Sequence, residues 1–208
     1  MNRLAILGAS GHGKVVADCA EACGWQQVVF FDDAWPEVSQ NGHWPVTGKT
    51  EDLLAGLASF DGVLVAIGNN RIRRDKLMML EGEGAALITV VHPAAVVSQY
   101  AHVGSGSVVF AGAVVNADAR MGMGAIVNTG ASIDHDCSLG DCVHVSPGAR
   151  LAGGVAVGDL SWIGIGAVVK QSVKIGGSAI VGAGAAVVKD VSDGQTVIGV
   201  PARAVDHQ

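Results

Sequence analysis

Residues 121–151 read MGMGAIVNTGASIDHDCSLGDCVHVSPGARL, and within this stretch an aliphatic residue returns at every sixth position. The same step of six continues in both directions, without an insertion, through seventeen consecutive aliphatic positions. These positions are Val91, Val97, Val103, Val109, Val115, Met121, Val127, Ile133, Leu139, Val145, Leu151, Val157, Ile163, Val169, Ile175, Val181 and Val187. An unbroken period of this length indicates a structural repeat.

Two further positions of the repeat are restricted. The residue four places after each aliphatic one is never larger than valine, as in Ala131, Cys137, Val143 and Ala149. The residue directly after the aliphatic one is often glycine, which we expect in turns that need a positive φ. These glycines are Gly104, Gly122, Gly140, Gly158, Gly164, Gly176 and Gly182.

The period of six fits neither a helix nor an ordinary strand, whose apolar residues recur at 3.6 and at 2. One large and one small inward residue in every six instead favours a prism, in which each hexapeptide forms one flat side and the coils stack at the strand spacing of about 4.8 Å. Few aromatic residues (4%) and 30 glycines suit such thin, regular packing. The sequence therefore predicts a parallel β-helix over residues 91–208.

Composition and charge exclude several classes of protein. Half of the residues are hydrophobic and 15% are charged, which indicates a packed core rather than disorder. A net charge of −6 argues against a nucleic-acid-binding surface. No apolar run approaches the ~20 residues of a transmembrane helix, and the apolar run at residues 4–7 is too short for a signal peptide. Four cysteines in two distant pairs lack zinc-site spacing, so we expect buried thiols and a cytoplasmic protein.

Residues 1–90 have a different pattern. Apolar strands are expected at residues 4–7, 28–31, 62–67 and 87–91, with helices over 15–23 and from Arg71 onward. This alternation predicts a small, Rossmann-like parallel sheet, and thus an α/β domain over residues 1–90.

Three loops of this domain follow strands and should meet at the carboxyl edge of the sheet, where such sheets bind ligands. The loop at residues 8–14, GASGHGK, opens a helix and offers backbone N–H groups to a phosphate. Its glycine spacing departs from G-x-G-x-x-G, and the domain is large enough for a mononucleotide only. Acidic residues after the second strand could accept a hydrogen bond from a ribose or a base.

Seven short motifs occur in order along the chain: GASGHGK at 8–14, DD at 32–33, IGNN at 67–70, NT at 128–129, HDC at 135–137, HVSP at 144–147 and GVPA at 199–202. Together they resemble the sugar O-/N-acyltransferase family of hexapeptide-repeat proteins, over essentially the whole chain. That family includes the UDP-4-amino-sugar N-acetyltransferases of bacillosamine synthesis and the sialic acid O-acetyltransferases.

The resemblance implies a left-handed β-helix, a homotrimer with active sites between subunits, and acetyl-CoA as co-substrate. It assigns the nucleotide-sugar substrate to the N-terminal domain, with contacts from Ser10, Gly11, His12, Asp32, Asp33 and Gly68. It assigns the coenzyme to His144, Ala152, Ile165, Gly182 and Ala183. Asp136 stands where the bacillosamine enzyme has a glutamate after its histidine, so the partner geometry of this shorter carboxylate stays open.

Acetyl transfer to an amine needs a base for the amine proton and a donor for the developing oxyanion. Of the seven histidines, only His135 lies in the repeat between two carboxylates, Asp134 and Asp136. We expect His135 to act as the base, with Asp136 or Asp134 orienting its ring, and the N–H of Gly153 to bind the oxyanion. Because a thioester is already activated, we expect direct transfer without a covalent enzyme intermediate and without a metal.

The identity of the acceptor is the least constrained expectation. The first expectation is N-acetylation of a UDP-4-amino-4,6-dideoxy sugar, and the alternatives are a GDP-linked amino sugar or O-acetylation of a sialic acid or other sugar. A zinc hydratase would use His135 and His144 but lacks a third ligand at suitable spacing. The hypothesis of an NAD-dependent oxidoreductase is supported by the glycine-rich loop alone. A further alternative is a non-catalytic, nucleotide-sugar-binding scaffold subunit, which would not need His135.

Overall fold

The structure is a computed structural model that describes residues 2–205. It divides into two compact units, Met1–His92 and Pro93–Gln208, and each is described by itself.

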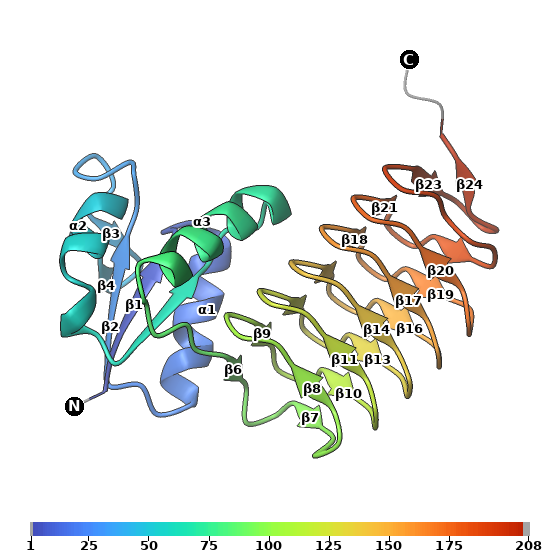
Figure 1. Cartoon of the computed structure of the whole chain (residues 1–208), viewed down its shortest axis with the longest axis horizontal. Helices are drawn as coiled ribbons and strands as arrows, with labels where there is room; N and C mark the ends of the chain where they lie inside the picture. The colour runs from blue at the N-terminus through green and yellow to red at the C-terminus, as the bar shows by residue number, and fades with distance from the viewer. Residues whose placement is uncertain (1, 206–208) are drawn as a thin grey trace. The chain divides into compact units, whose positions relative to one another are not determined.

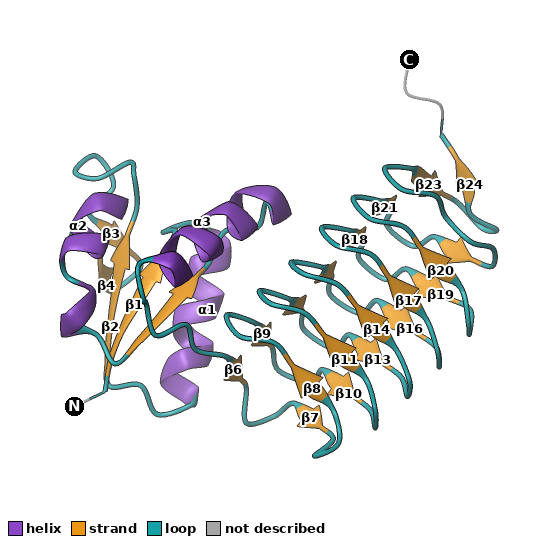
Figure 2. Ribbon diagram, viewed as in Figure 1, coloured by secondary structure: helices purple, strands orange, loops and turns teal. Residues whose placement is uncertain are grey.

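The first unit is built on a three-stranded parallel sheet (Figures 1 and 2). Its strands are β1 (Arg3–Leu7), β2 (Gln27–Phe31) and β5 (Gly62–Val65), in the order β2-β1-β5. Helix α1 (Gly11–Ala22) follows β1 and helix α3 (Asn70–Gly82) follows β5. Since apolar side chains fill β1 on both faces, this strand is central and buried, as expected for a parallel sheet.

Several smaller elements of this unit were not predicted from the sequence. They are the hairpin β3 (Gln40–Asn41) and β4 (Trp44–Pro45), helix α2 (Thr50–Ala55) and a 3-10 turn over Leu57–Ser59. The fourth strand, predicted over residues 87–91, is reduced to β6 (Val90–Val91), and Leu87 forms only an isolated bridge with Val63. Each element is too short to carry a periodic signal.

The second unit is a parallel β-helix with three flat faces, whose stacked coils are clear in Figure 1. The β13 face holds β7 (Val96–Val97), β10 (Val114–Val115), β13 (Ser132–Ile133), β16 (Arg150–Leu151), β19 (Val168–Val169) and β22 (Ala186–Val187). The β14 face holds β8 (His102–Val103), β11 (Arg120–Met121), β14 (Ser138–Leu139), β17 (Ala156–Val157) and β20 (Lys174–Ile175). The β15 face holds β9 (Val108–Val109), β12 (Ile126–Val127), β15 (His144–Val145), β18 (Trp162–Ile163), β21 (Ile180–Val181), β23 (Thr196–Ile198) and β24 (Arg203–Ala204).

The core of the β-helix follows the predicted repeat. The second residue of each two-residue strand points inward, so that Ile133, Val145 and Ile163 are fully buried. The small residues predicted at the corners, such as Ala131 and Ala149, are also fully buried. Where a serine takes this place the structure satisfies it, since the Ser161 hydroxyl donates to the Gly176 carbonyl at 2.6 Å and accepts from the Ala179 N–H at 3.0 Å.

The expected positive φ at the glycines that directly follow the aliphatic residues is wrong. Gly104, Gly122, Gly140, Gly158, Gly164, Gly176 and Gly182 do not have positive φ; positive φ occurs two residues later in the turn, as at Gly124 and Gly184. They are glycines because the next coil lies against them: a Cβ on Gly158 would lie 2.5 Å from the Gly177 nitrogen. The close stacking of coils, and not turn conformation, requires the missing side chain.

Three of the four cysteines, Cys19, Cys137 and Cys142, are buried as expected, whereas Cys23 is exposed; none forms a disulfide. Within residues 2–205, no helix combines the length and the apolar character that crossing a membrane requires.

The inward aliphatic residues should dominate the stability of the β-helix. Ile175 is buried and stacks between Val157 and Val191. We predict that Ile175→Ala lowers the free energy of unfolding by about 2–5 kcal/mol, because it leaves a cavity in a packed stack. Thermal or denaturant unfolding measures the loss. The adjacent Lys174 points outward and is exposed, so Lys174→Ala is the control and should change little; an equal loss in both variants would contradict this account of the core.

Candidate active site

The turn Asp134–Asp136 contains the predicted base His135 and is called the catalytic turn for that reason; it leaves the β13 face directly after Ile133. The Nδ1 atom of His135 lies 2.7 Å from Oδ2 of Asp136. A carboxylate only accepts hydrogen bonds, so Nδ1 carries the proton and the lone pair is on Nε2. Asp136 reaches this place with a left-handed φ of 59°, at a turn position that is Gly154 in the next coil. The shorter carboxylate therefore does contact the histidine.

The two aspartates have separate roles, which the sequence left open. One oxygen of Asp134, Oδ1, accepts the backbone N–H of His135 at 2.8 Å and the side-chain amide of Asn116 at 2.9 Å. These bonds lower the pKa of Asp134 and keep it ionised. The pKa of His135 is raised, first by the hydrogen bond to Asp136 and next by the charge of Asp134. Asp136 thus orients the ring, while Asp134 holds the backbone and adds charge.

The His135 ring lies directly against Gly153 of the next coil. A Cβ on Gly153 would lie 2.5 Å from Nε2 of His135 and 2.6 Å from Cε1. The fold itself does not require glycine here, since His135 itself and Gln171 occupy the same place in the preceding and following coils. The N–H of Gly153 donates no hydrogen bond to any of residues 2–205. The Nε2 edge of His135, the predicted base, therefore lies against a residue whose backbone N–H has no partner among residues 2–205.

A second feature is a groove of about 530 Å³ on the β15 face. His144 is buried there, with its ring centroid 4.0 Å from that of Trp162 and Nε2 3.3 Å from the Asn128 amide nitrogen. The hydroxyl of Ser146 is buried in the groove and has no hydrogen-bond partner among residues 2–205. Since buried hydroxyls are normally satisfied, this one is available to a molecule bound in the groove, either water or a ligand.

The predicted coenzyme residues fall in two places. His144, Ile165, Gly182 and Ala183 all line the groove on the β15 face. Ala152 instead lines a hollow of about 290 Å³ on the β13 face, next to Gly153 and together with Asp134 and Arg150. His135 and His144 therefore lie on different sides of one prism, and a single chain does not bring base and groove together.

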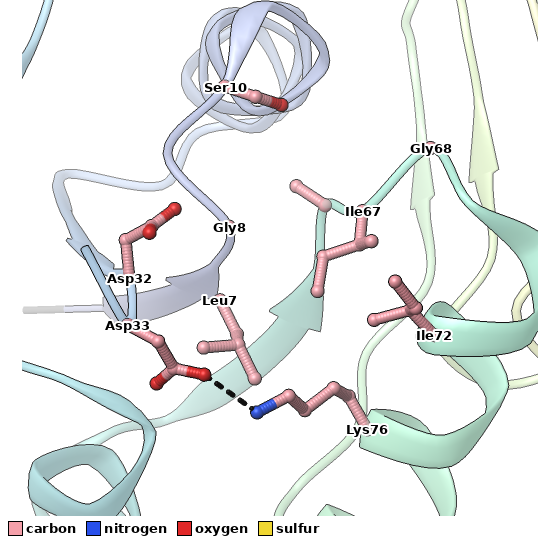
Figure 3. Close-up of a pocket in the computed structure, with 10 residues that line it drawn as sticks. Leu7, Gly8, Ser10, Asp32, Asp33, Ile67, Gly68, Ile72 and Lys76 are labelled. Atoms are coloured by element: carbon pink, nitrogen blue, oxygen red, sulfur yellow. Dashed lines mark hydrogen bonds and ion pairs between the residues drawn. The ribbon is translucent and has the colours of Figure 1, made fainter.

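The first unit has a pocket of about 270 Å³ at the carboxyl edge of its sheet (Figure 3). Four of the six predicted substrate residues line it, namely Ser10, Asp32, Asp33 and Gly68. Leu7, Ile67 and Ile72 provide apolar walls. Ser10 is the N-cap of α1 but its side chain makes no capping bond, so the first turn of the helix keeps N–H groups for a ligand.

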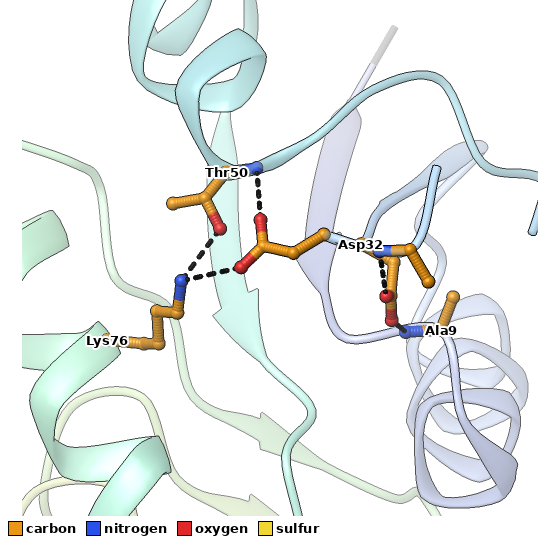
Figure 4. Close-up of polar contacts among 6 residues, drawn as sticks. Ala9, Asp32, Thr50 and Lys76 are labelled. Atoms are coloured by element: carbon orange, nitrogen blue, oxygen red, sulfur yellow. Dashed lines mark hydrogen bonds and ion pairs between the residues drawn. The ribbon is translucent and has the colours of Figure 1, made fainter. Parts of the chain in front are cut away.

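The two acids after β2 are held differently (Figure 4). Asp32 accepts the backbone N–H of Ala9 at 2.7 Å and that of Ala34 at 3.0 Å, so it fastens the glycine-rich loop. Asp33 accepts the backbone N–H of Thr50 at 3.0 Å and pairs with the Lys76 ammonium at 3.0 Å. These contacts, with the Thr50 hydrogen bond first among them, lower the pKa of Asp33 to about 2.

The remaining predicted substrate residues, Gly11 and His12, lie in the first turn of α1 and outside the residues that line the pocket. Burial, and secondly the positive charge of Arg73, lower the pKa of His12 to about 4, so its ring is neutral at pH 7. Arg73 is itself buried and donates to the carbonyls of Ile67 and Gly68. It thereby fixes the loop that forms one wall of the pocket.

Sequence reasoning assigned no role to five residues of these sites: Lys76, Asn116, Ser146, Trp162 and Arg73. Lys76 and Arg73 lie on the helix predicted after the third strand. The sequence did not show which face of that helix packs against the sheet, so it did not show that these two side chains point toward the pocket. Trp162 lies at an outward strand position, whereas Asn116 and Ser146 directly follow an inward aliphatic residue, where glycine is frequent but other residues occur. Among residues 2–205, no group of three or more histidine, cysteine or acidic side chains could hold a metal ion.

Comparisons with known proteins agree with this architecture. Residues 3–80 match the model of the PglD N-terminal domain. The chain is 38% identical over 115 residues to UDP-N-acetylbacillosamine N-acetyltransferase from Bacillus subtilis (strain 168), a match that covers 53% of this chain and 52% of that protein. The chain thus aligns with about half the length of this curated relative.

Two solved structures match along nearly the whole chain. The acetyltransferase domain of PglB from Neisseria gonorrhoeae FA1090 is 44% identical, with a TM-score of 0.94 and coverage of 99% of this chain and 100% of that one. PerB from Caulobacter crescentus, in complex with CoA and GDP-perosamine, is 39% identical, with a TM-score of 0.94 and coverage of 99% and 98%.

These matches confirm the predicted fold class, a small Rossmann-like sheet followed by a left-handed β-helix. They also confirm the resemblance stated from the motifs. The chain belongs to the hexapeptide-repeat family of sugar N-acyltransferases.

Proposed function

We propose that the protein is an acetyl-CoA-dependent N-acetyltransferase that acts on the amino group of a nucleotide-linked sugar. The observation that carries this proposal is the His135 imidazole, hydrogen-bonded to Asp136 and lying against Gly153, whose backbone N–H has no partner among residues 2–205. A base and an oxyanion donor on neighbouring residues are what the attack of an amine on a thioester requires. The zinc hydratase and oxidoreductase hypotheses explain neither this pairing nor the family.

The reaction is a direct transfer. The amine nitrogen forms a bond to the thioester carbon, and its proton passes to Nε2 of His135. The Gly153 N–H hydrogen-bonds the carbonyl oxygen as it gains negative charge. The C–S bond then breaks, and the imidazolium returns the proton to the sulfur of the leaving thiolate. No side-chain nucleophile and no metal take part.

The groove on the β15 face is the proposed coenzyme site. Four residues expected to contact acetyl-CoA line it, and the buried Ser146 hydroxyl offers a donor to the amide carbonyls of the pantetheine arm. A solved relative, the PglB acetyltransferase domain, is described in complex with acetyl coenzyme A, at 45% identity and a TM-score of 0.94. This supports acetyl-CoA as the co-substrate.

The pocket of the first unit is the proposed nucleotide site, with the diphosphate at the first turn of α1 and Gly68 opposite. The relatives named above act on or bind UDP- and GDP-linked amino sugars. A UDP-4-amino-4,6-dideoxy sugar is the first expectation for the acceptor, and a GDP-linked amino sugar is the second. Acetyl-CoA and nucleotide sugars are both cytoplasmic metabolites, and this supports a cytoplasmic location.

We further propose a homotrimer, because a single chain separates the base from the coenzyme groove. Large apolar side chains are exposed on two adjacent faces and on the corner that joins them: Val168 (44%) on the β13 face, Ile180 (48%) on the β15 face and Ile165 (58%) at the corner. The β14 face instead presents His102, Arg120, Ser138 and Lys174. A heterologous contact that closes into a ring would cover both apolar faces.

In such a ring the β13 face of one subunit packs on the β15 face of the next. The catalytic turn lies at the edge of the β13 face, so His135 of one subunit lies beside the groove of its neighbour. Each active site is then shared by two chains.

Removing the base should abolish turnover without removing the coenzyme. We predict that His135→Ala lowers kcat by about 10²–10⁴-fold, the usual contribution of a general base, while acetyl-CoA binding by calorimetry stays near normal. The control is His102→Ala on the exposed β14 face. Unchanged turnover in His135→Ala would rule out His135 as the base, and absence of transfer by the wild-type chain would favour the non-catalytic scaffold.

The pH dependence of activity should show how Asp136 and Asp134 affect the pKa of His135. His135 must be neutral to accept a proton, and its pKa is raised, so activity should fall as the pH drops through a value above the ordinary 6.5. Asp136→Asn replaces the hydrogen bond to a carboxylate, the larger cause, by a weaker bond to a neutral amide oxygen. Asp134→Asn removes the charge alone, since asparagine keeps an oxygen for the backbone N–H of His135. Both variants should move the acid limb of kcat/KM to lower pH, Asp136→Asn further. An acid limb that stays fixed in both would rule out His135 as the titrating base.

Breaking the apolar contact should separate the subunits and stop catalysis. Val168→Glu buries a charge in the proposed interface and should give a particle with the mass of one 21.0 kDa chain in light scattering. Transfer activity should be lost with it. Ser138→Glu, on the β14 face, should leave both the assembly and the activity intact. A wild-type monomer with full activity would contradict the shared site.

A further inference from the structure

One end of the nucleotide pocket holds an ion pair to which the proposed chemistry gives no role. The Lys76 ammonium lies 3.0 Å from Oδ2 of Asp33 and 2.8 Å from the Thr50 hydroxyl. The lysine comes from α3, the aspartate follows β2, and Thr50 begins α2. Figure 3 shows the pair at the edge of the hollow, away from Ser10. Three segments distant in sequence are thus fastened together at this point.

The pair keeps unused hydrogen-bonding capacity. An ammonium has three N–H donors, and two of those on Lys76 are engaged. The carboxylate of Asp33 has about four acceptor sites, and its contacts with the backbone and side chain of Thr50 and with Lys76 leave one of them unused. The pocket therefore presents one donor beside one acceptor, with both side chains already fixed in place.

This end of the pocket suits an uncharged ligand group. The ion pair has no net charge, and Asp33, whose pKa is near 2, stays ionised and would repel a phosphate. The first turn of α1, with its uncapped N–H groups, is the better place for the diphosphate. Leu7, Ile67 and Ile72 give the space between these two ends apolar walls, which suits a flat ring.

We infer that Lys76 is a specificity-determining residue that, with Asp33, selects nucleotides whose base presents a carbonyl next to a ring N–H. Uracil and guanine have this edge, so that the carbonyl accepts from Lys76 and the ring N–H donates to Asp33. Adenine and cytosine present a ring nitrogen acceptor next to an exocyclic amine, which reverses the order of donor and acceptor. The inference rests on the proposed function, because it assumes that the pocket binds the nucleotide of the substrate.

The test is calorimetric binding of UDP, GDP, ADP and CDP to the full chain. UDP or GDP should bind at least about tenfold more tightly than ADP and CDP, in line with the discrimination of one paired base edge. The stronger of UDP and GDP then names the nucleotide. Lys76→Met should weaken the preferred nucleotide by about tenfold and leave ADP and CDP unchanged.

Two control variants show whether the effect of Lys76→Met is specific to the lost donor. Arg74→Met removes a positive charge from the same helix outside the pocket lining, so it should change none of the four affinities by more than about twofold. Lys76→Arg keeps a donor and should retain the preference, which separates loss of the donor from misfolding of Lys76→Met.

The results that would overturn the role of Lys76 differ from those that would overturn the proposed function. Equal binding of all four nucleotides, or an equal loss of all four in Lys76→Met, would overturn the role of Lys76 and leave the proposed function standing. Absence of binding by every nucleoside diphosphate would overturn both.

Discussion

The stacking of one coil on the next is the constraint on which the β-helix depends. Each strand pairs with the strand eighteen residues further on, as Ile133 does with Leu151, and the inward side chains form continuous apolar columns. Removing these side chains from water supplies most of the free energy that orders a chain so rich in glycine. The same stacking forces glycine at places such as Gly158, where the next coil leaves no room for a Cβ.

Because the coils repeat so strictly, departures from the repeat mark the site. Gly153 breaks a column that otherwise carries side chains, and the imidazole of His135 fills the space it leaves. Asp136 takes a left-handed conformation that Gly154 takes one coil later, and this aims its carboxylate at Nδ1. The scaffold thus provides fixed, rigid positions, and a few departures from the repeat at one corner build the proposed catalytic site.

The N-terminal unit carries the proposed nucleotide site in loops at the edge of a small sheet. Its polar contacts join segments that are distant in sequence: Asp32 fastens the loop after β1, and Asp33 joins α2 to α3 through Thr50 and Lys76. The proposed division, with chemistry in one unit and recognition in the other, would explain why the β-helix alone indicates an acyltransferase but not its acceptor.

The architecture could be predicted from the sequence alone. A period of six leaves one arrangement of inward residues, so the β-helix followed from the spacing of Val, Ile and Ala, and the motif His135-Asp136 gave the candidate base. Folding was needed to show which carboxylate contacts which atom, that Gly153 lies against the ring, and that Ala152 lies apart from the other predicted coenzyme residues. It also revealed Lys76, Asn116 and Ser146. The physical reason is that outward positions of a solenoid and loops of a sheet carry no periodic constraint, so their side chains acquire meaning only from neighbours that folding brings to them.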